Sequence, residues 1–438
     1  MLSAYIKTYG CQMNEYDSEV MAGLLKEVGY HLIDNPEGAD IILLNSCYVR
    51  EKVKHKVYSR LGELGKLKGK NPHLILGLCG CLVQREPEEI IQRMPFLDFL
   101  LGPFSFHKLP EVINNVRENH KMIVDVEKSN NGLPEGLPKL RKRKFSAFVP
   151  VIRGCNNFCS YCNVPYVRGR EKSRAPEDIL REVEELSSCG YKEVTLLGQN
   201  VNSYGKDLKE RIDFADLLSI INQIEGIKRI RFTTSHPGDL SSKLIRNMGN
   251  LEKVCEHLHL PLQAGSDKIL GWMGRGYTRS TYRDLVKEAR RVVPEISLTT
   301  DIIVGFPGEE ERDFQDTLDL VKEVRFDGAF TFVYSRLKGT KAAKLEHQIP
   351  EEVKKERLRR LIEVQQKITR ENNKALVGKE LIVLVEGLSK KDERELQGRT
   401  RRNKIVVFKG ERNLTGKFIR VNITEAGCWA LRGDMVSC

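Results

Sequence analysis

Short apolar runs alternate with segments of helical spacing along the first part of the chain, residues 1–118. A compact apolar run predicts a buried strand, and apolar residues three or four apart predict a helix. The predicted strands are Ala4–Thr8, Asp40–Asn45 and His73–Leu78, and the predicted helices are Ser18–Gly29, Arg50–Lys66 and Glu86–Arg93. This alternation indicates a small parallel sheet with helices on both faces.

A second alternating region spans residues 147–345. Its predicted strands are Phe148–Ile152, Glu193–Leu197, Ile227–Thr233, Glu256–His259, Ser297–Ile303 and Ala329–Val333. A helix is predicted at Pro176–Cys189, because proline is typical of a first helical position and Gly190 of a helix end. A run of strand–helix units predicts a full or partial (β/α) barrel, with its chemistry at the carboxyl ends of the strands.

A linker is predicted between these regions, over residues 119–146. Asn130-Asn131-Gly132, Pro134 and Pro138 interrupt regular structure there. The basic run from Lys139 to Lys144 fits either a solvated segment or a contact with a phosphate backbone.

The last part of the chain changes character after a long charged helix predicted at Pro350–Lys379. Residues 380–438 hold short β-rich runs separated by glycines and charged turns, which predicts a small closed β-barrel. A small basic barrel is a recurrent way to hold nucleic acid, and a merely solvated positive surface is the alternative. The basic residues gathered there are Arg394, Arg399, Arg401, Arg402, Lys404, Lys409 and Arg412.

The composition indicates which partners and which cellular compartment suit these domains. The 438 residues include 72 Lys and Arg against 60 Asp and Glu, and the net charge of +12 suits a polyanionic partner or a solubilising surface. No apolar run is long enough to span a bilayer and no secretion signal is visible, so a cytosolic protein is expected. In a reducing compartment, 11 cysteines favour metal ligands or reactive thiols over disulfides.

The most informative stretch is Cys155-Asn-Asn-Phe-Cys159-Ser-Tyr-Cys162, a C-x3-C-x2-C run. Three thiolates on one loop bind three irons of a [4Fe–4S] cube and leave the fourth iron open to a small molecule. S-adenosylmethionine offers that iron an amine and a carboxylate. Three ordinary loop cysteines are the alternative. A zinc site is disfavoured because it usually takes C-x2-C pairs and four ligands.

Three further cysteines, Cys11, Cys47 and Cys81, each follow a predicted strand of the first region. The carboxyl ends of parallel strands meet at one edge of a sheet, so this placement would bring the three thiolates together as a second metal site. Each is equally compatible with a small buried residue, and Cys79 is a rival for Cys81. Plain structural roles are expected for Cys189, Cys255, Cys428 and Cys438.

Polar or glycine-rich stretches follow several strands of the second region. Glycines let the backbone approach a ligand, but they also make turns; their recurrence at strand after strand favours a ligand site. His236 and His259 are interpreted as structural, hydrogen-bonded residues. The stretches are Gly198-Gln-Asn200, Ser235-His-Pro237, Leu262-Gln-Ala-Gly265 and Asp301-Ile-Ile-Val-Gly305-Phe-Pro-Gly308-Glu309.

The octet Cys155–Cys162 resembles the signature of the radical S-adenosylmethionine enzymes, and nearly the whole chain resembles their methylthiotransferase family. The ribosomal-protein branch of that family carries a different pair at Gln12-Met13. One departure is Gly198-Gln-Asn200, where many radical enzymes have Gly-Gly-Glu. Similarity to the bacterial tRNA branch rests on Tyr9-Gly-Cys-Gln-Met-Asn-Glu15 with Asp17-Ser-Glu19, Tyr166-Val-Arg-Gly-Arg-Glu171 with Ser173-Arg174, and Gly398-Arg-Thr-Arg-Arg-Asn-Lys-Ile-Val-Val-Phe408.

The resemblance implies three domains: a flavodoxin-like methylthiotransferase domain (1–118), a radical core with its connecting helix (147–379) and a TRAM RNA-binding barrel (380–438), with 119–146 as the linker. It implies one [4Fe–4S] cluster on Cys155, Cys159 and Cys162. It implies a second on Cys11, Cys47 and Cys81, which decides against Cys79. Contacts to S-adenosylmethionine are expected from Tyr161, Gly198, Gln199, Asn200, Ser235, Gln263 and Val304, and contacts to RNA from Arg399, Arg401, Arg402 and Lys404.

The reaction implied by the resemblance adds a methylthio group to carbon 2 of N6-isopentenyladenosine at position 37 of tRNA, beside the anticodon. Carbon 2 carries an unactivated C–H bond, so cofactors must supply the hard step. One cluster would cleave S-adenosylmethionine to a 5′-deoxyadenosyl radical. The other would carry the sulfur, which a second S-adenosylmethionine methylates. The expected partners are the anticodon stem-loop, an electron donor such as flavodoxin, and a sulfur or cluster donor.

Three alternatives remain open from the residues. The same chemistry on threonylcarbamoyl-adenosine or on a ribosomal protein is the nearest, and Gln12-Met13 argues against both. A non-catalytic iron–sulfur RNA-binding regulator is the second, and the long strand–helix array with polar strand ends disfavours it. A structural zinc protein is the third; iron and sulfide in cluster proportions would exclude it.

Overall fold

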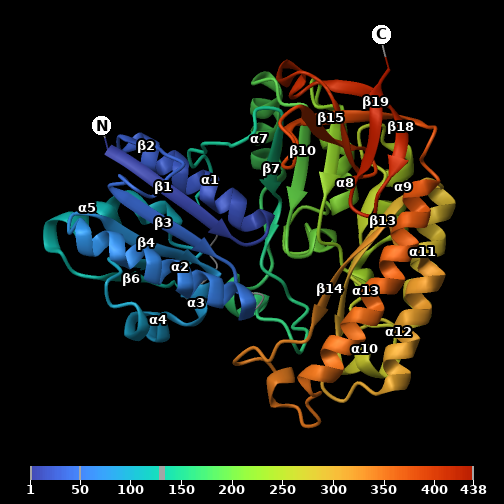
Figure 1. The fold of residues 1–438 in the computed structure, drawn as a ribbon, viewed down its shortest axis with the longest axis horizontal. Coiled ribbons are helices and arrows are strands. Elements are labelled where there is room, and N and C mark those ends of the chain that lie inside the picture. The colour runs from blue at the N-terminus through green and yellow to red at the C-terminus, as the bar shows by residue number, and fades with distance from the viewer. Residues whose placement is uncertain (1, 49–50, 128–133, 437–438) are drawn as a thin grey trace.

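Three parts of the chain surround a common centre in the computed structural model, which describes residues 2–48, 51–127 and 134–436 (Figure 1). An N-terminal sheet domain, blue to cyan, lies beside a larger array of strands and helices, and a small red barrel contacts that array. Asn130-Asn131-Gly132 of the predicted linker and Cys438 lie outside the described residues.

The N-terminal domain is a six-stranded parallel sheet in the order β2-β1-β3-β4-β5-β6. This is the flavodoxin-like order with one strand added, as predicted. β3 and β4 are buried along their whole length, because helices cover both faces of the sheet and both sides of each strand are apolar. The strands are β1 (Leu2–Tyr9), β2 (Tyr30–Leu32), β3 (Ile41–Ser46), β4 (Ile75–Gly80), β5 (Phe99–Leu101) and β6 (Ile123–Asp125).

Five helices cover this sheet. α1 and α5 pack on one face, and α2, α3 and α4 on the other. The prediction that the first helix starts at Ser18 was wrong: it starts at Gln12, because Asn14 and Asp17 are polar yet fully buried and hide the helical period. The helices are α1 (Gln12–Glu27), α2 (Glu51–Lys70), α3 (Cys81–Arg85), α4 (Pro87–Arg93) and α5 (Leu109–Asn119).

The central array is a partial barrel of parallel strands that follow one another in chain order. Its two three-stranded sheets, β7-β10-β11 and β12-β13-β14, are joined by a parallel bridge between Ile230 and Val254. A short antiparallel pair, β8 with β9, follows β7. The strands are β7 (Ser146–Pro150), β8 (Ile152–Arg153), β9 (Lys172–Ser173), β10 (Glu193–Leu197), β11 (Arg229–Phe232), β12 (His257–His259), β13 (Ser297–Val304) and β14 (Gly328–Val333).

Helices form the outer layer of the partial barrel, and α13 runs along its edge strand β14 (Figure 1). All of them except α6 share one apolar core with the strands, and Val167 of α6 packs in a core of the N-terminal domain. The helices are α6 (Val164–Val167), α7 (Pro176–Ser188), α8 (Phe214–Gln223), α9 (Ser242–Asn250), α10 (Asp267–Met273), α11 (Arg279–Val292), α12 (Glu311–Val324) and α13 (Glu351–Lys374).

The C-terminal part is a closed five-stranded barrel in the order β15-β16-β17-β19-β18, as the β-rich runs predicted. β16 was not predicted, because its sequence Glu-Leu-Gln-Gly-Arg-Thr has a single apolar residue; glutamate, glycine and threonine occupy its other buried positions. The strands are β15 (Glu380–Leu388), β16 (Glu395–Thr400), β17 (Ile405–Lys409), β18 (Phe418–Ala426) and β19 (Leu431–Met435).

The basic run that precedes β7 is partly buried between domains. The Arg141 guanidinium lies 2.5 Å from a Glu182 carboxylate oxygen of α7 and 3.5 Å from one of Glu19 of α1. Its side chain is only 8% exposed, so at Arg141 the run is neither a solvated segment nor available to a phosphate. Lys142 and Arg143, in contrast, are exposed.

Candidate active site

The first three cysteines come together at the carboxyl edge of the N-terminal sheet. Their strands, β1, β3 and β4, are neighbours in that sheet. Cys11, Cys47 and Cys81 each follow the last residue of their strand by one or two positions. All three line a cavity of about 430 Å³ that lies between the N-terminal domain and the partial barrel.

Cys79 takes a different position from Cys81. It is fully buried in the apolar core that α1 and α5 form with the sheet, and this burial raises the pKa of its thiol. Cys81 is the first residue of α3 and borders the cavity. The geometry therefore presents Cys81 to the cavity, and Cys79 to the core.

Buried amides fix the loops that carry these cysteines. Asn14 accepts a hydrogen bond from the Cys11 thiol at 3.4 Å, and its amide nitrogen donates to Asn45 at 3.1 Å. A side-chain hydrogen bond with Cys47 lowers the pKa of the Cys11 thiol to about 6, with the Arg168 guanidinium acting in the same direction. At neutral pH this environment favours a thiolate, the form that binds metals.

Gly80 shapes the turn before Cys81, and we expect Gly80→Ala to weaken metal retention there. The φ of Gly80 is +99°, and a Cβ at this position would lie 2.5 Å from the Asn45 side-chain oxygen. Strain of this kind costs about 1–3 kcal/mol. Iron content after anaerobic reconstitution measures the effect. Gly29→Ala is the matched control, because its φ is +88° with no heavy atom within 4 Å, and it should retain iron normally.

The second set of cysteines lies on the loop between β8 and α6. The Cys155 amide donates to the Gly169 carbonyl at 3.2 Å, and the Ala342 amide donates to the Ser160 carbonyl at 2.8 Å. Gly154 precedes the loop with φ +79°, and a Cβ there would lie 2.0 Å from the Arg170 carbonyl oxygen. The loop is thus held from both sides, and Cys162 reaches the same cavity as the first set.

Both cysteine sets have the donor chemistry of an iron–sulfur cluster. Among the described residues, no three His, Cys, Asp or Glu side chains converge closely enough to hold a single ion. A cubane does not require that convergence, because each thiolate binds a different iron. Burial raises the pKa of Cys155 to about 11 and that of Cys162 to about 12, so these thiols release protons when they bind iron.

Three of the residues predicted to contact S-adenosylmethionine line the cavity: Tyr161, Gln199 and Gln263. Gln199 accepts a hydrogen bond from the Gly154 amide at 2.5 Å, which connects the end of β10 to the cysteine loop. Gln263 has φ +71°, an uncommon conformation for a residue with a side chain and one that is frequent at functional sites.

Unpartnered polar atoms mark the same end of the partial barrel. Within the described parts of the chain, Asn200 Oδ1, Ser235 Oγ and Gln263 Oε1 are buried without a hydrogen-bond partner. Such groups are costly to bury unless a ligand satisfies them, and a ligand with amino-acid and ribose groups would do so. Gly198 packs against Ile152, and the Val304 carbonyl accepts from the Tyr334 amide, so these two support the site from the backbone.

Sequence reasoning missed Arg275 in this site, whereas His236 is the structural, hydrogen-bonded residue that was predicted. The Arg275 guanidinium donates to the Cys159 sulfur at 3.4 Å and is buried. Burial and then Arg275 lower the pKa of His236 to about 3, so its imidazole is neutral; its Nδ1 accepts from the Gly238 amide. The only local signal for Arg275 is a charged residue between two glycines, Gly274 and Gly276.

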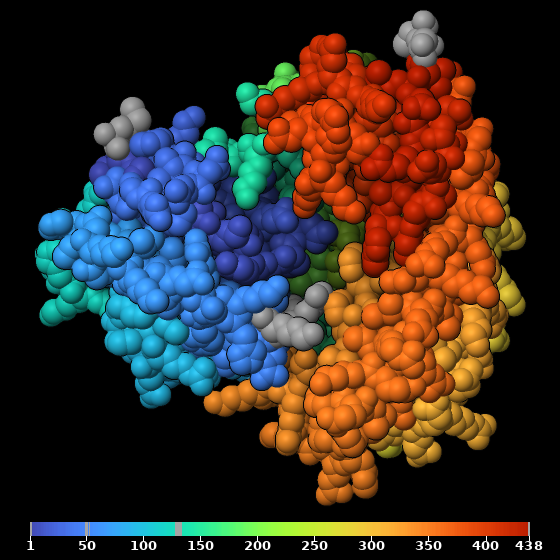
Figure 2. Space-filling view, viewed as in Figure 1, coloured from blue at the N-terminus to red at the C-terminus, as the bar shows by residue number. Residues whose placement is uncertain are grey.

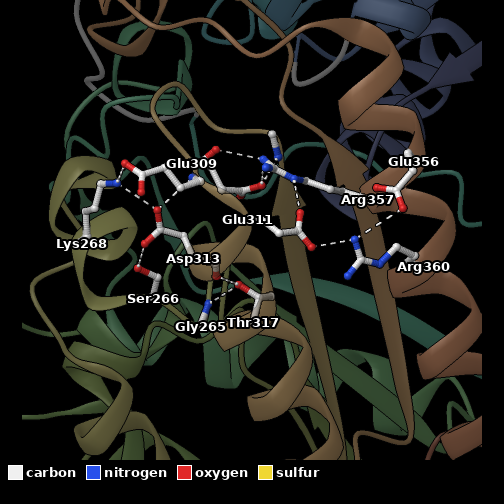
Figure 3. A network of polar contacts seen from close by, with 12 residues as sticks. Gly265, Ser266, Lys268, Glu309, Glu311, Asp313, Thr317, Glu356, Arg357 and Arg360 are labelled. Carbon is white, nitrogen blue, oxygen red and sulfur yellow. Dashed lines mark hydrogen bonds and ion pairs between the residues drawn. The ribbon is translucent and has the colours of Figure 1, made fainter.

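A network of charged residues holds the loops that follow β12 and β13 (Figure 3). A Glu309 carboxylate oxygen accepts from the Gly305 amide at 2.9 Å and from Arg357 of α13 at 2.8 Å. Asp313 of α12 accepts from the Ser266 hydroxyl at 2.7 Å. The outer helices α12 and α13 thereby fix the backbone beside Gln263 and Val304.

The four residues predicted to contact RNA all have partners within the chain. Arg401 binds both carboxylate oxygens of Glu256, and Arg402 pairs with Glu295. Lys404 lies 2.7 Å from Asp327, and Arg399 lies 3.2 Å from Glu386. The first three partners belong to the central array, so Arg401, Arg402 and Lys404 attach the small barrel to the amino ends of its strands. Their contact with RNA stays a prediction.

Comparison with known proteins agrees with this division into three parts. Residues 3–102 match the uncharacterized protein family UPF0004, residues 149–321 the Radical SAM superfamily and residues 374–436 the TRAM domain. The tRNA-2-methylthio-N(6)-dimethylallyladenosine synthase of Moorella thermoacetica is 53% identical over 98% of both chains. The protein of the same name from Carboxydothermus hydrogenoformans is 52% identical over 99% of both chains. The chain belongs to the radical S-adenosylmethionine methylthiotransferase family.

Solved structures support the fold of this family member. The radical S-adenosylmethionine methyltransferase TsrM from Kitasatospora setae has a TM-score of 0.55 at 13% identity, over 76% of this chain and 73% of that one. Membership of the Radical SAM superfamily implies a [4Fe–4S] cluster and S-adenosylmethionine, and the loop Cys155–Cys162 fits that cluster. Among the described residues, no helix has the length and apolar character needed to cross a membrane.

Proposed function

We propose that this chain adds a methylthio group to carbon 2 of N6-isopentenyladenosine at position 37 of tRNA. One observation carries the proposal: Cys11, Cys47 and Cys81 line the same cavity as Cys162, although they come from different domains. A sulfur source and a radical source can then act on one substrate atom. Relatives that are 53% and 52% identical over nearly their whole length bear the name of this tRNA activity.

Two [4Fe–4S] clusters and S-adenosylmethionine, when bound, supply the radical, the sulfur and the methyl group that side chains cannot provide. Cys155, Cys159 and Cys162 would hold one cluster, and Cys11, Cys47 and Cys81 the other. The unpartnered groups at Asn200, Ser235 and Gln263 would orient S-adenosylmethionine. An electron donor such as flavodoxin and a sulfur or cluster donor are further partners in this proposal, because the chemistry consumes electrons and sulfur.

The cavity is lined by both polar and apolar residues, which suits a prenylated adenine. Asn163 is buried with both side-chain polar atoms unpartnered among the described residues, so it can bind the edge of the base. The isopentenyl group would contact apolar side chains. Each CH2 group buried among them contributes about 0.8 kcal/mol of favourable free energy. The apolar side chains that line the cavity are Val164, Val167, Ile303, Phe332, Val333, Leu337 and Leu358.

A second, larger cleft offers a path for the RNA. It has a volume of about 740 Å³ and is lined by α1, β7, β11 and the small barrel. Figure 2 shows the molecule hollowed where its three parts meet. Phe330 of β14 lines this cleft, and the next residue, Thr331, lines the cavity. A loop nucleotide in the cleft would have to leave its stack to enter the cavity.

Lys142 and Arg143 line this cleft and are exposed, so we expect their replacement to weaken tRNA binding. Each lost phosphate contact lowers the slope of log K against log[salt] by about 0.9. The double variant Lys142→Gln/Arg143→Gln should therefore bind tRNA more weakly at low salt and show a slope reduced by about 2. Lys287→Gln, on the exposed face of α11, is the control and should bind as the parent does. An unchanged slope in the double variant would remove this edge of the cleft from the interface.

The function is tested with anaerobically reconstituted protein, S-adenosylmethionine, a reductant and two tRNA preparations, with and without the isopentenyl group. Mass spectrometry of the digested nucleosides is expected to show a methylthio gain only on the isopentenylated tRNA. A gain on neither, with 5′-deoxyadenosine still released, would move the substrate to threonylcarbamoyl-adenosine, another RNA or a protein. No deoxyadenosine, from protein with intact clusters, would contradict the enzyme and support a regulator.

A further inference from the structure

One short segment, Cys162 to Gly169, touches both cysteine sets. Cys162 begins it, and the Gly169 carbonyl at its end accepts from the Cys155 amide at 3.2 Å. Between them, Arg168 caps α6 and its Nε donates to the Cys81 sulfur at 3.0 Å. Arg168 belongs to the radical core and Cys81 to the N-terminal domain, so this contact crosses the domain boundary inside the cavity wall.

A buried carboxylate holds Arg168 in place. Asp17 is fully buried on α1, the helix that starts directly after Cys11. One of its oxygens accepts from Arg168 Nη2 at 2.7 Å, and the other lies 3.3 Å from Arg153 Nη1. The planar guanidinium of Arg168 therefore donates to two groups at once, Asp17 and Cys81, and these bonds fix its orientation.

Positive charge gathers beside the Cys81 sulfur in this triad. Two buried guanidiniums, Arg153 and Arg168, face the carboxylate of Asp17. A nearby negative group stabilises buried positive charge. The group that Arg168 touches is Cys81, which becomes a thiolate when it binds iron. The arrangement resembles Arg275 on Cys159, but Arg275 stays within its own domain.

We propose that Arg168 is a positioning residue of the radical core that orients Cys81 and raises the reduction potential of the cluster held by Cys11, Cys47 and Cys81. The inference rests on the two-cluster part of the proposed function. Net charge and hydrogen bonds to the sulfur ligands set the potential of an iron–sulfur cluster. A guanidinium at 3.0 Å from a ligand sulfur stabilises the reduced, more negative form. Because Arg168 joins the two domains through Cys81, the position of the N-terminal domain against the radical core also depends on this cysteine.

The test uses the full chain with Cys155, Cys159 and Cys162 replaced by alanine, so that only the N-terminal cluster is present. Potentiometric titration followed by electron paramagnetic resonance should give a more negative midpoint for Arg168→Gln. Arg168→Lys keeps the charge and should stay close to the parent. Arg170→Gln is the matched control, because Arg170 is exposed and stacks on Phe158 at 4.2 Å, and it should not shift the midpoint.

Asp17→Asn separates an electrostatic role from a merely structural one. If Arg168 acts through its charge, removing the neighbouring negative charge should shift the midpoint in the positive direction, opposite to Arg168→Gln. A merely structural role predicts that both variants, which break the same contact, shift it the same way. Equal signs, or an unchanged midpoint in Arg168→Gln, would overturn the proposal.

The iron and sulfide content of each variant decides the outcome where a variant does not retain its cluster. Loss of iron and sulfide in Arg168→Gln with retention in Arg168→Lys would support the role of the charge, and loss in both would overturn it. The assay contains neither tRNA nor S-adenosylmethionine, so the shift can be found even if the proposed substrate is wrong. Iron missing from the unsubstituted N-terminal set would instead contradict the two-cluster part of the proposed function.

Discussion

Replacing Cys11, Cys47 and Cys81 together by alanine is expected to abolish methylthio transfer while S-adenosylmethionine is still cleaved. We propose that Cys155, Cys159 and Cys162 hold the radical cluster, and the contacts of their loop to Gly169 and Ala342 are left intact by the substitutions. The variant lacks the proposed ligands of the sulfur-carrying cluster, and side chains do not supply that chemistry. Methylthiolated nucleoside should fall by about 10³-fold or more, whereas 5′-deoxyadenosine should still form.

Cys79→Ala is the matched control for this experiment, because Cys79 neighbours Cys81 in sequence but lies in the apolar core. It removes one buried sulfur and should retain both products and the full iron content. The reciprocal variant, with alanine at Cys155, Cys159 and Cys162, should lose both products. Full methylthio transfer by the chain without Cys11, Cys47 and Cys81 would refute the proposed division of labour.

Several strands and the loop Cys155–Cys162 were predictable because their signals are local. Glu193–Leu197 is a strand with its predicted bounds, since a short β-rich run lies between Gly190 and Gly198. Cys11, Cys47 and Cys81 have no common sequence motif, yet each follows a strand, and parallel strands bring such positions to one edge. Topology thus converts three distant residues into one predictable site.

The contacts between domains were not predictable, because they pair residues far apart with no periodic signal. In the sequence, Asp17 has the pattern of a solvated residue before a helix. Its partner Arg168 is 151 positions away. Arg401 belongs to a basic cluster that resembles an RNA contact, but Glu256 neutralises it within the chain. Whether a charge meets a ligand or an acid of another domain depends on packing that local patterns do not encode.

Arg231→Met is expected to loosen the small barrel from the central array. Arg231 is buried on β11 and donates to Glu193 at 2.8 Å, to the Thr400 carbonyl at 2.6 Å and to the Arg401 carbonyl at 2.9 Å. Its removal leaves the buried Glu193 carboxylate without that partner. Breaking a buried pair from one side costs about 3–5 kcal/mol. Hydrogen exchange at the amides of β16 and β17 measures the free energy of the opening that releases the barrel.

A second substitution separates the charge from the packing. In Arg231→Met/Glu193→Gln the uncompensated carboxylate is gone, so part of the lost stability should return, and the double-mutant cycle gives the coupling between the two residues. Arg394→Met is the surface control, since Arg394 is 89% exposed and pairs with its sequence neighbour Asp392. Equal protection of β16 and β17 in Arg231→Met and the parent would mean that the other contacts suffice to hold the barrel. These contacts are the hydrogen bonds of Arg229 to the Ile382 and Arg399 carbonyls and the ion pair of Arg401 with Glu256. Faster exchange confined to the small barrel would identify β11 as the strand that anchors the TRAM domain to the central array.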